Sequence, residues 1–228
     1  MSLSPKEFVP IFFDNTSQTY DKVAYWSTFG KDNLWKNEII KKIQNADSIL
    51  DLACGTGILT RRLATCFPRS KIVAVDITKN YLEIAEKNST SFSNVSFVHQ
   101  DAEKLALDKK FDCICSSYIP KYCDPEILVK NCMNHLNPAG QIILHDFTYP
   151  KNYLIQKIWN LYFILLNFIG IFIPSWKEAF FNLPKLIKTS NWFDSYKKEF
   201  EKNNFDVVLQ NLTWHTSAIL VATKTNCN

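Results

Sequence analysis

The sequence has few glycines and no cysteine pattern typical of a metal site, and both absences narrow its function. Only five of the 228 residues are glycine, so a glycine that recurs at a strand end is informative. The seven cysteines include no CxxC pair and no Cys/His spacing typical of zinc. We therefore expect no metal, and we expect reduced, buried thiols in a reducing compartment.

Long basic runs and a leader-like segment are missing as well. Lys and Arg number 26 against 22 Asp and Glu, a net charge of +4 without a basic cluster, so nucleic acid is not an expected partner. The first residues include Lys6, Glu7 and Pro10 where a secretory signal would be apolar. We expect a cytoplasmic protein, with peripheral membrane contact left open. The sequence does not predict the oligomeric state.

One apolar run competes with that location. The segment 159–174 is almost wholly apolar but has 16 residues, includes two asparagines and ends in proline, whereas a membrane-spanning helix needs about 20 apolar residues. A buried helix or an interfacial segment is the better prediction.

Between residues 47 and 147, short apolar or β-branched runs alternate with segments of helical spacing. The expected strands are 48–53, 71–76, 95–101, 111–117 and 141–147, and the expected helices are 58–66, 79–88 and 125–136. This alternation is typical of a parallel sheet covered on both faces. Runs at 206–214 and 217–224 predict a closing antiparallel pair. The expected fold is α/β, a doubly wound, Rossmann-like sheet of seven mostly parallel strands.

The end of the first expected strand holds two of the five glycines. Asp51 is followed by Gly55 and Gly57, just before a helix. Glycine lets the backbone turn sharply and approach a ligand closely. The third glycine of a dinucleotide fingerprint is absent, because Thr60 stands three residues after Gly57.

Acidic residues occur at the ends of three successive expected strands. Asp51 is suited to an ammonium group, Asp76 to both hydroxyls of a ribose, and Asp101, beside Ala102, to an adenine amino group. Each Asp has an alternative role as a helix cap. An amino acid joined to an adenosine has all three features, and the sequence therefore predicts S-adenosylmethionine as the cofactor.

These ordered motifs resemble those of class I S-adenosylmethionine-dependent methyltransferases. The likeness lies in residues 51–57, 76, 100–102 and 111–112. Flanking segments are similar to signatures of the ubiquinone/menaquinone biosynthesis C-methyltransferases, namely Phe13-Asp14, Tyr20-Asp21, Gly30 and Trp35-Lys36 in the first, LNPAGQIILHDFT at 136–148 in the second, and Asn211-Leu-Thr213 near the C-terminus.

The resemblance implies further cofactor contacts. It adds Thr60 and Ser117 to the site and supports Asp76, Asp101 and Ala102.

The sequence also departs from that family. Asp32 stands where a His is usual, Asp146 replaces a Glu, and SYIPKY at 117–122 replaces a Gly-Leu-Arg-Asn stretch at the substrate mouth. These departures lie outside the residues expected to hold the cofactor, except for Ser117.

Methyl transfer to a phenolic or quinol carbon needs a base that takes the ring hydroxyl proton. The candidates at the ends of the fourth and fifth expected strands are Tyr118, His145 and Asp146, and register with the family signature favours Asp146. Lys121 is suited to stabilising a phenolate, and His215 is a further candidate base.

We expect one domain in four parts. These are an N-terminal helical lid (1–46), a cofactor-binding core (47–147), an apolar lid or insert (148–191), and a C-terminal helix with a strand pair (192–228). The apolar run at 153–176 is suited to an isoprenoid tail or a membrane interface.

Three functions follow from these features. The leading one is methylation of a hydrophobic, prenylated quinol-like aromatic acceptor on carbon. The second is O-, N- or S-methylation of a small soluble metabolite, and the third is a non-catalytic protein that binds S-adenosylmethionine.

Overall fold

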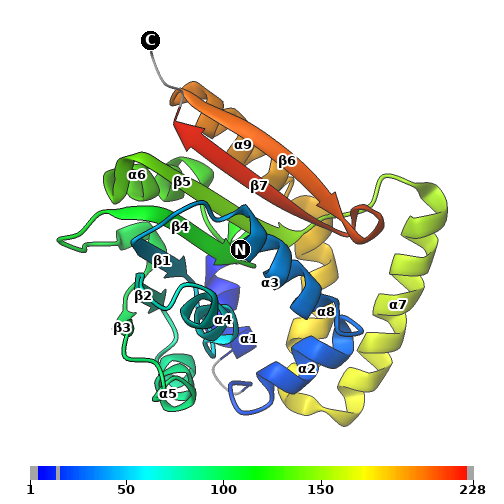
Figure 1. The fold of residues 1–228 in the computed structure, drawn as a ribbon. Helices are drawn as coiled ribbons and strands as arrows, with labels where there is room; N and C mark the ends of the chain where they lie inside the picture. The colour runs from blue at the N-terminus through cyan, green and yellow to red at the C-terminus, as the bar shows by residue number, and fades with distance from the viewer. Residues whose placement is uncertain (1–4, 14–15, 225–228) are drawn as a thin grey trace.

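The computed structural model describes residues 5–13 and 16–224, so Asp14 of the N-terminal motif lies outside the described residues. Figure 1 shows a central sheet with helices packed around it. In chain order the elements are η1 Pro5–Glu7, α1 Phe8–Phe13, α2 Tyr20–Ser27, α3 Lys31–Lys42, β1 Ser48–Leu52, α4 Ile58–Cys66, β2 Lys71–Asp76, α5 Lys79–Asn88, β3 Val95–His99, η2 Ala102–Lys104, β4 Phe111–Ser117, η3 Pro120–Tyr122, α6 Pro125–Asn134, β5 Leu136–Phe147, α7 Tyr153–Phe172, α8 Pro174–Thr189, α9 Trp192–Lys202, β6 Phe205–Leu212, η4 Thr213–His215 and β7 Ser217–Lys224.

The seven strands form one sheet in the order β3-β2-β1-β4-β5-β7-β6. All neighbours pair in parallel except β7, which is antiparallel to both β5 and β6. The expected doubly wound, mostly parallel sheet is confirmed. The strand order reverses between β1 and β4, and such a switch point opens a crevice at the carboxyl ends of the strands.

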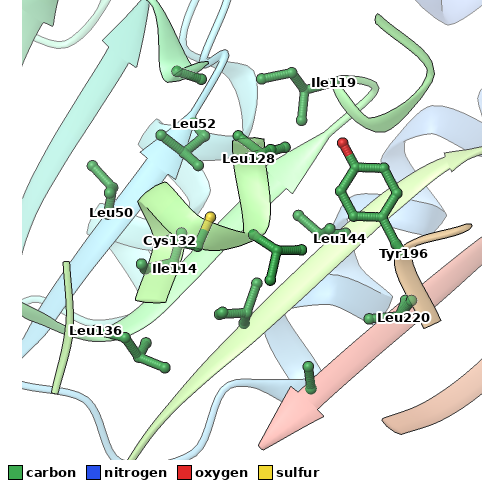
Figure 2. Packing of buried hydrophobic residues seen from close by; sticks show 14 of the residues in the cluster. Leu50, Leu52, Ile114, Ile119, Leu128, Cys132, Leu136, Leu144, Tyr196 and Leu220 are labelled. Atoms are coloured by element: carbon green, nitrogen blue, oxygen red, sulfur yellow. The ribbon is translucent and has the colours of Figure 1, made fainter. Parts of the chain in front are cut away.

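One face of the sheet is covered by α6 and α9. Leu128 and Cys132 of α6 and Tyr196 of α9 pack on Leu144 and its strand neighbours, all of them buried, as Figure 2 shows. The side chain of Asp124 caps α6 by accepting from the N–H groups of Glu126 and Ile127. This cap and the inward apolar side chains explain why the sequence folds as a helix here.

The opposite face is covered by α3 and α4. Ile39 of α3 and Leu63 of α4 are fully buried against Ile49, Cys113 and Ile143 of the sheet. These strands are buried on both faces, which agrees with their continuous apolar sequence.

A third cluster lies beyond the sheet and joins α1, α7 and α8. Trp159 and Phe163 of α7 pack with Trp176 and Phe180 of α8 and with Phe12. The helix α8 was not predicted from the sequence, because Pro184 and its mixed aromatic and polar residues hide the helical period.

The helix α7 is longer than the apolar run predicted. The helix begins at Tyr153, and the Asn152 side chain caps it by accepting from the N–H groups of Leu154 and Ile155. It has 20 residues, whereas the apolar run in the sequence has 16. Within the described part of the chain it is the one helix whose length and composition would allow it to span a membrane. Only 22% of its most apolar window is buried.

Candidate functional site

A tight loop links β1 to α4 at the switch point of the sheet. Gly55 and Gly57 have φ values of +57° and +77°, which residues with a side chain rarely adopt. A Cβ on Gly57 would also lie 3.1 Å from the Cβ of Ala85. Both glycines are therefore needed for the loop to pass this close to α5.

The Asp76 carboxylate lies at the end of β2 and anchors this loop. Its Oδ2 accepts from the N–H of Gly55 at 2.8 Å, and its Oδ1 accepts from the N–H of Thr78 at 2.7 Å. Burial raises the pKa of Asp76. Asp76 also lines the main cavity, and a carboxylate has about four acceptor positions, so it can accept hydroxyl donors from a ligand there.

Asp51 lies behind the glycine loop instead of at the cavity surface. Its Oδ2 accepts from the Thr60 hydroxyl at 2.6 Å, and both side chains are buried. Burial raises the pKa of Asp51 to about 7. The structure thus divides the expected cofactor residues. Asp51, Gly57 and Thr60 form a supporting layer that is absent from the cavity lining.

The remaining expected cofactor residues, Asp101, Ala102 and Ser117, line the cavity together with Gly55 and Asp76. Asp101 forms an ion pair with Lys6 of η1.

The Asp101 carboxylate also accepts from the N–H of Glu103 at 3.0 Å. Asp101 therefore has the helix-cap role weighed from the sequence, and it also lines the cavity.

His145 is not at the cavity, which corrects the expectation that it acts as a base. Its Nδ1 lies 2.9 Å from Ser117 Oγ and its Nε2 lies 2.7 Å from Ser217 Oγ. Burial lowers its pKa well below the usual value. With both ring nitrogens hydrogen-bonded inside the fold, this histidine holds Ser117 in place and has no free nitrogen for an acceptor.

Asp146 is also unavailable as a free base. Its Oδ1 lies 2.7 Å from Lys121 Nζ, and both side chains are almost fully buried. The carboxylate further accepts from the N–H groups of Lys121 and Phe147, and it does not line the cavity. Its role in the structure is to neutralise Lys121, whose pKa burial lowers.

Tyr118 is the catalytic candidate that the structure brings to the cavity. Its Oη donates to Asp32 Oδ1 at 2.7 Å, and Asp32 forms a buried ion pair with Lys36. The ring of Tyr118 stacks on Phe147 with 4.8 Å between centroids. Its φ of +78° is a strained value for tyrosine, of the kind that clusters at functional sites.

Sequence reasoning missed the pairing of Asp32 with Tyr118. In the sequence, Asp32 was noted only as a departure from the family motif. Its pairing with Lys36 could have been predicted, because an acidic and a basic residue four positions apart on a helix are neighbours. Its contact with Tyr118 joins residues 86 positions apart, which no local pattern predicts.

The cavity connects this polar edge of the sheet to an apolar interior. Its volume is about 680 Å³, within the range of ligand pockets. From the strand ends it continues between α7 and α8, where Trp159, Phe163, Leu166 and Ala179 line it. One continuous space therefore offers polar anchors at one end and an apolar chamber at the other.

Comparison with known proteins places the chain among methyltransferases. Residues 2–224 match the model of the ubiE/COQ5 methyltransferase family. A demethylmenaquinone methyltransferase from Staphylococcus epidermidis is 25% identical, with 97% of this chain and 95% of that protein covered. The ubiquinone/menaquinone biosynthesis C-methyltransferase UbiE from Francisella tularensis subsp. novicida is 28% identical, with 93% and 89% covered.

Solved structures share the fold at low sequence identity. The plantazolicin methyltransferase BpumL, in complex with SAH, has a TM-score of 0.69 at 12% identity, with 97% of this chain and 96% of that one covered. Geranyl diphosphate C-methyltransferase from Streptomyces coelicolor A3(2) has a TM-score of 0.63 at 10% identity, with 85% and 81% covered.

Proposed function

The chain belongs to the ubiE/COQ5 methyltransferase family and is an S-adenosylmethionine-dependent methyltransferase, and from that premise we propose that it methylates a ring carbon of a quinol-like acceptor with an apolar tail. The names of its relatives, a demethylmenaquinone methyltransferase and a ubiquinone/menaquinone biosynthesis C-methyltransferase, support a quinol ring. The observation that carries the proposal is the single cavity that joins the polar strand ends to the chamber between α7 and α8.

The cofactor end of that cavity suits S-adenosylmethionine. Asp76 presents a buried carboxylate that would accept from the ribose hydroxyls, and the open backbone at Gly55 allows a ligand to approach closely. Ala102 and Ser117 would complete this wall. When bound, S-adenosylmethionine supplies an electrophilic methyl group on a sulfonium.

The chain's own task is to position the acceptor and to take its proton. Tyr118 Oη still has lone pairs to accept from a ring hydroxyl while it donates to Asp32. The hydroxyl proton passes to Tyr118 as Tyr118 gives its own proton to Asp32, which leaves electron density on the ring for attack from carbon. The proton then returns from Asp32 through Tyr118 to the ring oxygen, while the methylated carbon releases its own proton to solvent and the ring regains aromaticity.

Two lysines hold Tyr118 in place for this role. Lys121 Nζ donates to the backbone carbonyl of Tyr118 at 2.8 Å and lies 5.4 Å from the centre of its ring. Lys36 Nζ lies 4.9 Å from the same ring. Each lysine is itself paired with a buried carboxylate, Lys36 with Asp32 and Lys121 with Asp146, so the two lysines position the ring without adding net charge.

The apolar chamber accounts for the tail. The rings of Trp159 and Phe163 lie 4.3 Å apart between centroids, and the cavity is lined by few polar groups along α7 and α8. Binding of an isoprenoid chain there would be stabilised by about 0.8 kcal/mol for each methylene removed from water. Exclusion of water along the same path protects the methyl transfer.

Turnover of labelled S-adenosylmethionine on a panel of acceptors tests the proposal. The panel pairs demethylated quinols with short and long isoprenoid tails against soluble phenols and amines, with cofactor affinity measured in parallel. We expect transfer to a carbon of the tailed quinols and a lower KM for the longer tail. Transfer only to a soluble acceptor would contradict the proposed substrate, and tight cofactor binding without any transfer would favour a binding protein.

The substitution Ala179→Phe gives the panel a structural readout. Ala179 lies on the chamber wall and is buried, so the larger ring should fill the tail site and raise KM for long-tailed quinols about tenfold or more, with tail-free turnover unchanged. Ala139→Phe, at an exposed position outside this cavity, is the matched control. Equal effects on tailed and tail-free acceptors would remove the chamber from the binding site.

A further inference from the structure

The outward side of α7 is a broad apolar surface. Its residues Leu154, Leu161, Ile164, Phe168, Ile171 and Phe172 are 58–72% exposed. They recur at spacings of three, four and seven positions, which places them on one side of a helix. The opposite side carries the buried stripe of Trp159, Phe163 and Leu166. Contiguous exposed apolar surface of this kind marks an interaction site on a soluble domain.

This apolar surface continues to the mouth of the cavity. Leu161 and Leu165 are half exposed and also line the cavity. Phe29 and Trp214 line it as well and are more than 70% exposed, and the Phe29 ring lies 5.8 Å from that of Tyr162 on α7. A partner that covers the outward side of α7 would therefore meet the cavity opening.

Basic residues outnumber acidic residues in the segment that contains α7 and α8. Between residues 148 and 191 the acidic residue is Glu178, and the basic residues are Lys151, Lys157, Lys177, Lys185 and Lys188. Within the described residues none of these lysines forms an ion pair. On α9, by contrast, Lys197 and Lys202 pair with glutamates.

Two of the unpaired lysines lie over exposed aromatic rings. Lys157 Nζ is 4.6 Å from the centre of the Tyr153 ring, and Lys185 Nζ is 3.8 Å from that of Phe181. A lysine in this arrangement can keep its apolar stem in an apolar phase while its ammonium group reaches phosphate groups.

Three arrangements could cover this face, and the charges and packing favour one. A symmetric contact with a second copy would bring the unpaired lysines of both copies together. A membrane-spanning helix would have to remove Trp159, Phe163 and Leu166 from α8 and from the cavity wall. A helix that lies in the surface of an anionic bilayer keeps this packing and pairs the lysines with headgroups.

We propose that the outward side of α7 docks this enzyme on an anionic membrane, with the helix lying in the headgroup region so that the acceptor enters the cavity directly from the lipid. This inference deepens the proposed function, because it rests on an acceptor that resides in the bilayer.

Vesicle co-sedimentation of the full chain tests the docking. Vesicles of phosphatidylcholine with about one third phosphatidylglycerol are compared with vesicles of pure phosphatidylcholine. We expect clear binding to the anionic vesicles and roughly fivefold weaker binding for each of Lys157→Gln and Lys185→Gln, from the attraction of one lysine to an anionic surface. On pure phosphatidylcholine the two lysine variants should match the unaltered protein.

The apolar surface is tested by the double substitution Ile164→Glu with Phe168→Glu. Neither residue lines the cavity, so cofactor affinity and turnover of a tail-free quinol in solution should be unchanged, while vesicle binding should fall more than tenfold. Val208→Glu is the matched control, because Val208 is 64% exposed on the edge strand β6. Vesicle binding of this control should equal that of the unaltered protein.

The experiments distinguish a wrong substrate from a wrong docking surface. If the substrate is wrong, vesicle binding persists without turnover of tailed quinols. If docking is wrong, tailed quinols in detergent are still methylated while the unaltered protein stays off the vesicles, or the double variant binds them equally well. Sedimentation velocity tests the alternative that a second copy of the chain covers this face. If the unaltered protein is a dimer that does not bind vesicles, and the double variant is a monomer, then this face is a dimer interface.

Discussion

The two walls of the cavity are built by different means. At the strand ends, Asp76, Ser117 and Tyr118 are each held by hydrogen bonds of 2.7–2.9 Å. Along α7 and α8 the wall consists of packed rings and aliphatic side chains. The polar wall defines positions for particular atoms, whereas the apolar wall defines a volume.

This difference indicates how each wall tolerates change. A buried hydrogen bond is directional, and loss of one partner leaves the other unsatisfied at a cost of about 1–3 kcal/mol. Apolar contacts are not directional, and a core accepts side chains of similar volume at a cost below about 1.5 kcal/mol. Small changes should therefore be severe at the strand ends and mild along α7.

The largest effect is expected at Tyr118. Tyr118→Phe removes the Oη that relays a proton to Asp32, and kcat for a quinol acceptor should fall by about 10²–10⁴-fold. Cofactor affinity and the melting temperature should change little, since Asp32 keeps its pair with Lys36. Single-turnover kinetics measure the chemical step.

The matched control is Tyr122→Phe. Tyr122 lines the same cavity, and no hydrogen bond of its hydroxyl is found among the described residues, so its variant should stay within a few-fold of the unaltered rate. Equal rates for both variants would show that Tyr118 contributes only ring packing.

The next effect is the pH dependence of cofactor binding. Burial raises the pKa of Asp51 to about 7, so the carboxyl group is neutral below that pH and charged above it. Because Asp51 lies behind the glycine loop, its charge can act on the cofactor's ammonium group only through space, so affinity should be constant above pH 7 and fall by about tenfold at most between pH 7 and pH 5.

Calorimetric titration across this pH range measures the affinity, and Asp51→Asn should flatten the profile. A flat profile in the unaltered protein would show that the charge of Asp51 does not act on the cofactor.

The smallest effect is expected on the apolar wall. Leu166→Met keeps nearly the same volume, so kcat/KM for a long-tailed quinol should change less than about tenfold, and the free energy of unfolding by less than about 1.5 kcal/mol. Leu166→Asn places an unpaired amide in the chamber and is the contrasting variant. Steady-state kinetics and urea unfolding provide the two readouts. Similar losses in both variants would show that the wall depends on exact shape instead of apolar volume.

The sheet was predictable because its signals are local. β2 and β4 have the expected bounds, and the glycine loop lies at the expected strand end. Continuous apolar runs, strand-end acids and left-handed glycines each reflect the conformation of a few neighbouring residues. The helix α8 was not predicted, because its apolar side is defined by contacts with α7 and α1.

The assignment of a base was not predictable in the same way. Tyr118, His145 and Asp146 were all candidates by position, with Asp146 favoured by register, and the structure separates them by the partners of each side chain. His145 is hydrogen-bonded to two serines, Asp146 is paired with Lys121, and Tyr118 donates to Asp32 at the cavity wall.

The α/β sheet, the strand-end loop and the cofactor class follow from local sequence, because each depends on residue types at short spacing. Which polar groups are occupied by partners, and which side of α7 remains uncovered, follows only from the packing of distant segments. Those properties arise from contacts between residues distant in the chain, where burial and pairing change the charge, hydrogen bonding and accessibility of a side chain.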